Sequence, residues 1–258
     1  MAPLRTIAVD RYVTPLREGG SLPAVVEADD SGMYVLKFRG AGQGPRALVA
    51  ELVGGEIARI LGLPVPEIVF AQLDPDLART EPDPEIQSLI RASAGLNLAL
   101  DYLPGSFVFD PAATEVDGDL ASRLVWFDAF VSNVDRTAKN TNLLIWHRKL
   151  WLIDHGAALY FHHAWDGDVA AAQNPFAMIR QHVLLSRADK IEAVDAALAA
   201  RLDRGTFEAL LAQVPAEWLA GDDGAVDPEQ RRAAYVEYFV ARVEHRRRFV
   251  EEALRARG

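Results

Sequence analysis

Three oxygen-bearing side chains stand close together near the middle of the sequence: Asp135, Asn140 and Asp154. Carboxylate and amide oxygens are the hard ligands that Mg²⁺ prefers. Phosphoryl transfer also needs a carboxylate near the attacking hydroxyl, and it asks for little other covalent chemistry from the protein. Asp135 fits that carboxylate, and Asn140 and Asp154 fit the metal. The alternative is that Asp135 and Asn140 only cap turns, as Asx residues often do.

A helix is predicted directly before these residues. Apolar side chains recur at helical spacing over residues 119–132, and Asp117 or Asp119 can serve as the N-cap. Residues 133–140 are almost entirely polar, so they form a loop with little to bury. Loops that are fixed at both ends by rigid elements often carry functional groups.

A tight hairpin is predicted directly after the polar loop. Residues 143–146 and 150–153 are β-prone runs on either side of His147-Arg148. The hairpin would return Asp154 toward the polar loop. Gly156 could take a positive φ and let the chain turn sharply after the Asp154 carboxylate.

The order D-x4-N, hairpin, D-H-G resembles the catalytic and metal-binding loops of the protein-kinase-like fold. More narrowly, the run from Asn133 through Asp135 to Asn140 resembles the N-x-D-x4-N loop of HipA-type kinases. The likeness extends over about residues 22–158. Thr137 departs from the family, because toxin members commonly have His there. The extra N-terminal subdomain of those toxins is not expected in a chain of this length.

The resemblance also gives a role to Lys37, which interrupts an apolar strand pattern over residues 33–38. Taken alone, this lysine could simply point to solvent, because lysines are mostly exposed. In the kinase fold the strand lysine grips the α- and β-phosphates and pairs with a helix glutamate. A helix is predicted over residues 45–61, and it offers Glu51 or Glu56 as the partner. The spacing of Glu51 matches the family better.

Two glycine-rich loops could lie over the phosphates. The resemblance favours Gly19, Gly20 and Ser21, which separate two predicted strands, although an ordinary hairpin turn has the same pattern. Residues 40–44 are the second candidate, because a helix N-terminus behind glycines can bind an anion.

A strand predicted over residues 96–103 ends at Pro104, where we expect the boundary between two lobes. In the resemblance this is the hinge whose backbone meets adenine, at Asp101, Tyr102 and Leu103. A core strand that simply meets a turn would show the same pattern.

The expected fold is therefore α+β and two-lobed, as in protein kinases. A small β-rich N-lobe would comprise residues 1–103, and a larger helical C-lobe would comprise residues 104–258. In the C-lobe, the patterns predict helices over residues 187–202 and 207–214, and one long helix from Asp227 toward Arg255.

Composition limits the function further. The chain of 258 residues is 50% hydrophobic, enough for a globular core, and its net charge of −10 argues against nucleic acid or an anionic membrane as partner. The absence of cysteine excludes disulfides and thiolate chemistry, so a reducing cytoplasm is the simplest location. No run of 18 apolar residues and no secretory signal is present.

The resemblance implies an ATP- and Mg²⁺-dependent kinase, most simply one that phosphorylates serine or threonine in a protein. Two alternatives share the fold: a kinase acting on a small molecule or lipid, and a nucleotide-binding sensor without catalysis. A different alternative is a zinc hydrolase built on His162, His163 and Asp166, although no HExxH motif accompanies them.

Overall fold

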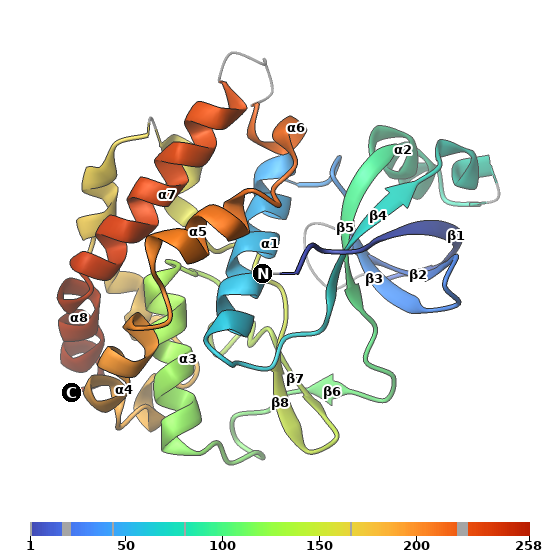
Figure 1. The fold of residues 1–258 in the computed structure, drawn as a ribbon. Helices are drawn as coiled ribbons and strands as arrows, with labels where there is room; N and C mark the ends of the chain where they lie inside the picture. The colour runs from blue at the N-terminus through green and yellow to red at the C-terminus, as the bar shows by residue number, and fades with distance from the viewer. Residues whose placement is uncertain (1, 17–21, 43, 80, 166, 221–226) are drawn as a thin grey trace.

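The structure is a computed structural model. It describes residues 2–16, 22–42, 44–79, 81–165, 167–220 and 227–258. A β-barrel lies at one end of the molecule and a group of helices at the other, with a small sheet between them (Figure 1).

The barrel is closed, with strand order β1-β2-β3-β5-β4. All neighbours are antiparallel except β1 and β4, which pair in parallel and close the barrel. Apolar side chains fill its interior, which is a hydrophobic core separate from the larger one. The strands are β1 (Thr6–Pro15), β2 (Ala24–Ala28), β3 (Met33–Lys37), β4 (Ile68–Leu73) and β5 (Gly95–Asp101).

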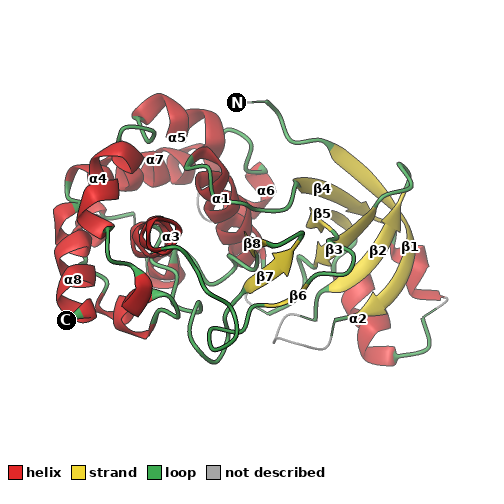
Figure 2. Cartoon of the chain, turned by 90° about the horizontal axis from the view of Figure 1, so that it is seen from below, coloured by secondary structure: helices red, strands yellow, loops and turns green. Residues whose placement is uncertain are grey.

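Helix α1 (Pro45–Ile60) leaves the barrel after β3 and packs mainly against the helical part. Its two adjacent glycines, Gly54 and Gly55, lie where His155 and Ile68 come close to the helix backbone. A helix as apolar as α1 is buried on most of its surface, so its side chains belong to the larger core. The 3₁₀ turn η1 (Pro75–Arg79) and helix α2 (Pro84–Ala92), which follow β4 and precede β5 in the chain, instead pack against the barrel (Figure 2).

The helical part is built around α3 (Gly118–Phe130), which is buried along most of its length. Of the two predicted caps, Asp117 and not Asp119 caps α3: its carboxylate accepts the Asp119 and Leu120 N–H groups. The surrounding elements are η2 (Tyr160–Ala164), η3 (Val169–Gln173), η4 (Ala177–Gln181), η5 (Leu185–Arg187), α4 (Ile191–Ala199), α5 (Arg204–Leu211), α6 (Ala216–Leu219), α7 (Pro228–Glu244) and α8 (Arg247–Arg257).

Three predicted helices differ from the structure. The helix expected over residues 207–214 runs instead over Arg204–Leu211, because Asp203 caps it earlier. The helix expected over residues 187–202 begins only at Ile191, because η5 and a short turn precede it. The single helix expected from Asp227 toward Arg255 is interrupted at His245, where α7 ends and the chain bends into α8. None of the helices in the described ranges is both long and apolar enough to cross a membrane.

The small sheet joins β6 (Phe107–Val108), β7 (Leu143–Trp146) and β8 (Lys149–Leu152). The hairpin between β7 and β8 was predicted, and its turn places His147 and Arg148 at φ 47° and 62°. Two successive left-handed residues are typical of a type I′ turn, whose twist matches that of the flanking strands. The hairpin is thus a stiff connection between the polar loop and Asp154.

Candidate active site

A cavity of about 990 Å³ lies where the barrel meets the polar loop and the β7–β8 hairpin. Its wall includes Lys37 from β3, Asn140 from the polar loop and Asp154 after β8. The residues proposed as the hinge also line it: Asp101, Tyr102 and Leu103. Most of the predicted site residues therefore face one space.

Lys37 does not point to solvent. Its side chain is only 11% exposed, and its Nζ lies 2.8 Å from Asp154 Oδ1 and 3.7 Å from Glu51 Oε2. Glu51 comes from α1 and is almost completely buried. His155 lies on its other side, with Nδ1 3.6 Å from Glu51 Oε1. The alternation of β3 therefore turns Lys37 away from the barrel interior, where Tyr34 and Leu36 are buried, and toward two carboxylates from distant segments.

The charges of Lys37 and Glu51 stabilise each other. Burial opposes ionisation of Glu51, but Lys37 and His155 outweigh it and lower the pKa of the carboxyl to about 2. Burial likewise opposes the charge on Lys37, and the Glu51 and Asp154 carboxylates raise the pKa of this ammonium above its usual value. Lys37 is therefore charged at neutral pH and is held beside the cavity.

Glu56, the alternative partner of Lys37, points elsewhere. Its carboxylate pairs with Arg59 one turn along α1, with an N–O distance of 3.3 Å. Burial raises the pKa of the Glu56 carboxyl. Of the two glutamates, only Glu51 lies beside Lys37 among the ion pairs of the described residues.

The polar loop is held by its own side chains. Asp135 Oδ2 accepts hydrogen bonds from the Asn140 amide at 2.7 Å and from the Asn142 amide at 3.3 Å. Asn133 Oδ1 accepts the Asp135 N–H at 3.1 Å, which is a turn-capping bond. The turn-capping alternative concerned Asp135 and Asn140, and their side chains instead bond to each other; Asn140 lines the cavity, whereas Asp135 is not among its lining residues.

Asp154 itself, and not Gly156, provides the sharp turn after the hairpin. Asp154 has φ 55°, whereas Gly156 is not among the glycines with positive φ. The expectation for Gly156 was therefore wrong. A left-handed aspartate is uncommon, and such backbone strain is frequent at functional sites. It turns the Asp154 carboxylate toward Lys37.

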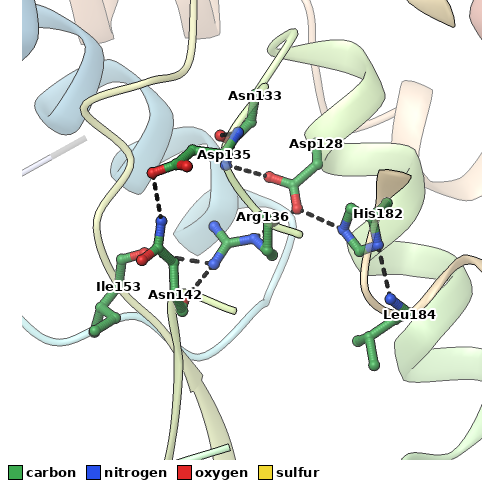
Figure 3. Close-up of polar contacts among 8 residues, drawn as sticks. All are labelled: Asp128, Asn133, Asp135, Arg136, Asn142, Ile153, His182 and Leu184. Carbon is green, nitrogen blue, oxygen red and sulfur yellow. Dashed lines mark hydrogen bonds and ion pairs between the residues drawn. The ribbon is translucent and has the colours of Figure 1, made fainter. Parts of the chain in front are cut away.

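A buried hydrogen-bond network lies behind the polar loop and was not predicted from the sequence. Asp128, on α3, accepts hydrogen bonds from Arg136 Nε at 2.6 Å, from His182 Nε2 at 2.8 Å and from the Asn133 amide at 2.9 Å (Figure 3). Burial opposes ionisation of Asp128, but Arg136 and His182 lower the pKa of its carboxyl to about 2. The available signal was a single carboxylate within the apolar run 124–131.

Two backbone N–H groups of the proposed hinge already donate hydrogen bonds to other parts of the chain. The Asp101 N–H donates to the Glu67 carbonyl at 2.8 Å, and the Tyr102 N–H donates to the Met33 carbonyl at 3.0 Å. A nucleotide would therefore have to use other groups of Asp101, Tyr102 and Leu103.

The two glycine-rich loops proposed to lie over the phosphates differ in what the structure shows of them. Gly19, Gly20 and Ser21 lie outside the described residues. Pro15, Leu16 and Pro23, near that loop, line the cavity. The described residues of segment 40–44 are not among its lining residues. The role of Gly19, Gly20 and Ser21 over the phosphates stays a prediction.

The histidine cluster has a structural partner. His162 is buried, and its Nδ1 lies 2.9 Å from the Tyr235 hydroxyl. Burial, with His163 and Arg46 nearby, lowers the pKa of His162 to about 3. Asp166 lies outside the described residues, and no three acidic or histidine side chains in the described ranges are arranged to hold a metal.

Comparisons with known proteins identify a family and a fold for this chain. A family model described as HipA-like kinase matches residues 9–252. No curated protein matches the sequence. Among solved structures, the Helicobacter pylori proinflammatory kinase CtkA is similar with a TM-score of 0.55 and 12% identity, over 98% of both chains.

A second similar structure is a Golgi casein kinase with Mn and ADP bound. Its TM-score is 0.51 at 12% identity, over 98% of this chain and 74% of that one. At such low identity these likenesses show the fold alone. The predicted two-lobed, protein-kinase-like α+β fold is therefore confirmed, whereas the exact boundary between residues 103 and 104 stays a prediction.

Proposed function

This chain belongs to the HipA-like kinase family, and we propose that it transfers the γ-phosphate of ATP, with Mg²⁺, to a serine or threonine hydroxyl of a protein. The observation that carries the proposal is the position of Lys37 between Glu51 and Asp154 at the wall of the large cavity. A buried, charged lysine between two carboxylates is the arrangement that phosphoryl transfer uses to hold phosphates.

Each side chain has a role in this proposal. Lys37 would hold the α- and β-phosphates, and Glu51 would keep Lys37 oriented. Asp135 would accept the proton of the attacking hydroxyl. The Gly19–Ser21 loop would cover the phosphates, and Asp101 to Leu103 would contact adenine.

Mg²⁺ would be held by Asn140 and Asp154. Both offer hard oxygen atoms to the same cavity, which fits the chemistry of a divalent cation. When bound, the metal supplies positive charge against the phosphate oxygens. The Golgi casein kinase, which shares the fold, has Mn and ADP bound.

A radiolabelled γ-phosphate assay tests the proposal directly. We expect wild-type protein to transfer label to itself or to a generic protein substrate when Mg²⁺ is present, and to lose transfer on chelation. Asp135→Ala should lower the rate about 100-fold or more, because a positioned base contributes about 10²–10⁴-fold. Asp10→Ala, at an exposed aspartate on β1, is the matched control and should retain the wild-type rate.

Acid hydrolysis of the labelled product then identifies the acceptor. Phosphoserine or phosphothreonine supports the protein-kinase assignment. Label found only on a small molecule or lipid would replace it with the alternative acceptor class. ATP binding without any transfer or hydrolysis would instead support the sensor.

A further inference from the structure

The buried Asp128 carboxylate joins three parts of the chain. It accepts hydrogen bonds from Asn133 and Arg136 in the polar loop and from His182, 54 residues away. The side chains of Asp128 and Arg136 are fully buried, and that of His182 is 2% exposed. Charge-assisted hydrogen bonds at such depth are strong and directional.

Arg136 carries the network to both ends of the hairpin. Its Nη1 donates to the Asn142 carbonyl and, at 3.4 Å, to the Ile153 carbonyl (Figure 3). The Asn142 amide contacts Asp135, and Ile153 directly precedes Asp154. One guanidinium therefore fixes the backbone beside the proposed base, Asp135, and beside the proposed metal ligand, Asp154.

His182 connects this network to the segment that follows the hairpin, residues 155–185, here called the post-hairpin segment. The Leu184 N–H donates to His182 Nδ1 at 3.0 Å, so the ring proton lies on Nε2 and points at Asp128. The Val183 N–H also donates to the Arg136 carbonyl at 3.1 Å, and His182 forms an isolated β-bridge with Thr137. The post-hairpin segment is thus bonded to the polar loop through side chain and backbone.

The post-hairpin segment contains no serine or threonine, and its one hydroxyl belongs to Tyr160; the exposed Ser186 follows directly after it. Many kinases order the equivalent segment by phosphorylating a hydroxyl, which then pairs with arginine. Here an arginine already has a permanent anionic partner inside the protein. Tyr160 is 61% exposed, and among the hydrogen bonds of the described residues it makes none to Asp128, Arg136 or His182.

We infer that Asp128 and His182 are positioning residues that hold the polar loop and the post-hairpin segment in their working arrangement without phosphorylation. This inference rests on the proposed kinase function and adds to it the way in which the site is kept ready. The kinase would accordingly be active as synthesised, and any control of it would act elsewhere.

Variants of His182 test the inference while the buried Asp128–Arg136 ion pair stays intact. Asp128→Asn would leave Arg136 without its counter-charge and threaten folding itself. His182→Phe removes the donor to Asp128 and the acceptor of the Leu184 N–H but leaves the Asp128–Arg136 ion pair in place, whereas His182→Gln keeps an N–H donor on a side chain of similar reach. We expect kcat to fall about 100-fold in His182→Phe with KM for ATP unchanged, because a small misplacement of a catalytic group has that effect.

His182→Gln should recover most of the lost kcat. Equal losses in both variants, or no loss in His182→Phe, would overturn the positioning role. Hydrogen–deuterium exchange of residues 133–142 gives a second readout that needs no turnover. Faster exchange in His182→Phe than in wild type supports the inference, and unchanged exchange contradicts it, even if the wild type proves to transfer no phosphate.

Phosphatase treatment tests the second half of the inference. Wild-type protein, checked by intact mass before and after treatment, should keep its kcat, and so should Tyr160→Phe. Loss of activity on dephosphorylation, or in Tyr160→Phe, would show that a phosphate is needed and would overturn the claim.

Discussion

Lys37 lies between two carboxylates that would have different tasks once a nucleotide binds. Its Nζ is closer to Asp154 than to Glu51, 2.8 Å against 3.7 Å. If Asp154 binds the metal, Glu51 becomes the carboxylate that keeps Lys37 in place. We expect Glu51→Gln to lower kcat/KM for ATP about tenfold or more, equivalent to ~1.4 kcal/mol of transition-state stabilisation.

The matched control for this prediction is Glu56→Gln on the same helix. Glu56 pairs with Arg59 and not with Lys37, so its neutral variant should keep wild-type kcat/KM. Steady-state kinetics with ATP as the varied substrate measures both. Equal effects of the two variants would mean that α1 acts only through its general stability.

At the residue scale, the sequence could predict side chains whose role depends on local spacing. Asp135 and Asn140 are five positions apart on one loop. The pairing of Lys37 with Glu51, which the resemblance to kinases implied, is also present. The Asp128–His182 contact could not be predicted, because it joins residues 54 positions apart through the tertiary fold. The periodicity of the sequence does not predict such a long-range contact.

At the scale of the element, α1 depends on two glycines. A Cβ at Gly55 would lie 2.4 Å from Ile68 Cδ1, and one at Gly54 would lie 3.1 Å from His155 Cβ. Glycine weakens a helix by about 1 kcal/mol, so close packing has to outweigh that cost. We expect Gly55→Val to lower the free energy of unfolding by about 1–3 kcal/mol, the usual effect of overpacking.

A double-mutant cycle with Ile68→Ala tests the cause. If the clash with Ile68 is responsible, removing that side chain should make Gly55→Val less harmful, and the two effects should not add. Thermal or urea unfolding measures all four proteins. Simple additivity would show that the destabilisation arises from some other contact of α1.

Elements were predictable where their signals are local. Strands β1, β2, β3 and β5, helices α1 and α3, and the hairpin follow from apolar periodicity, a cap and turn residues, whereas β6 was not predicted. The break between α7 and α8 could not be predicted, because the sequence has no glycine or proline there. At the end of α7, the buried Arg242 donates to the Ala129, Phe130 and Ala172 carbonyls, a tertiary contact that fixes where α7 lies.

At the scale of the whole molecule, the parallel pairing of β1 with β4 was not predictable. It closes the barrel across a separation of more than 60 residues, for example between Thr6 and Phe70. Equally, α1 was expected with the barrel, yet its buried face shares the larger hydrophobic core with the helical part. The helix that carries Glu51 is therefore anchored on both sides of the cavity.

The stability of the whole molecule should depend on pH through His162. This ring ties η2 to α7 through Tyr235, and its pKa is lowered to about 3 from 6.5. The folded protein keeps His162 neutral while the unfolded chain protonates it below pH 6.5. The stabilisation is therefore complete above pH 6.5 and is lost as pH falls toward 3. The expected loss is about 2–3 kcal/mol between pH 6.5 and 4.5, at 1.4 kcal/mol per unit.

His162→Gln removes this titration and should flatten the dependence of unfolding free energy on pH over that window. The variant can be less stable at pH 7, because only the slope is diagnostic. His245→Gln, at an exposed histidine after α7, should keep the wild-type slope. Urea unfolding at pH 7.0, 6.0, 5.0 and 4.5 measures the three proteins. If His162→Gln and wild type show the same slope, the acid sensitivity belongs to other groups, and the contact with Tyr235 does not depend on a neutral ring.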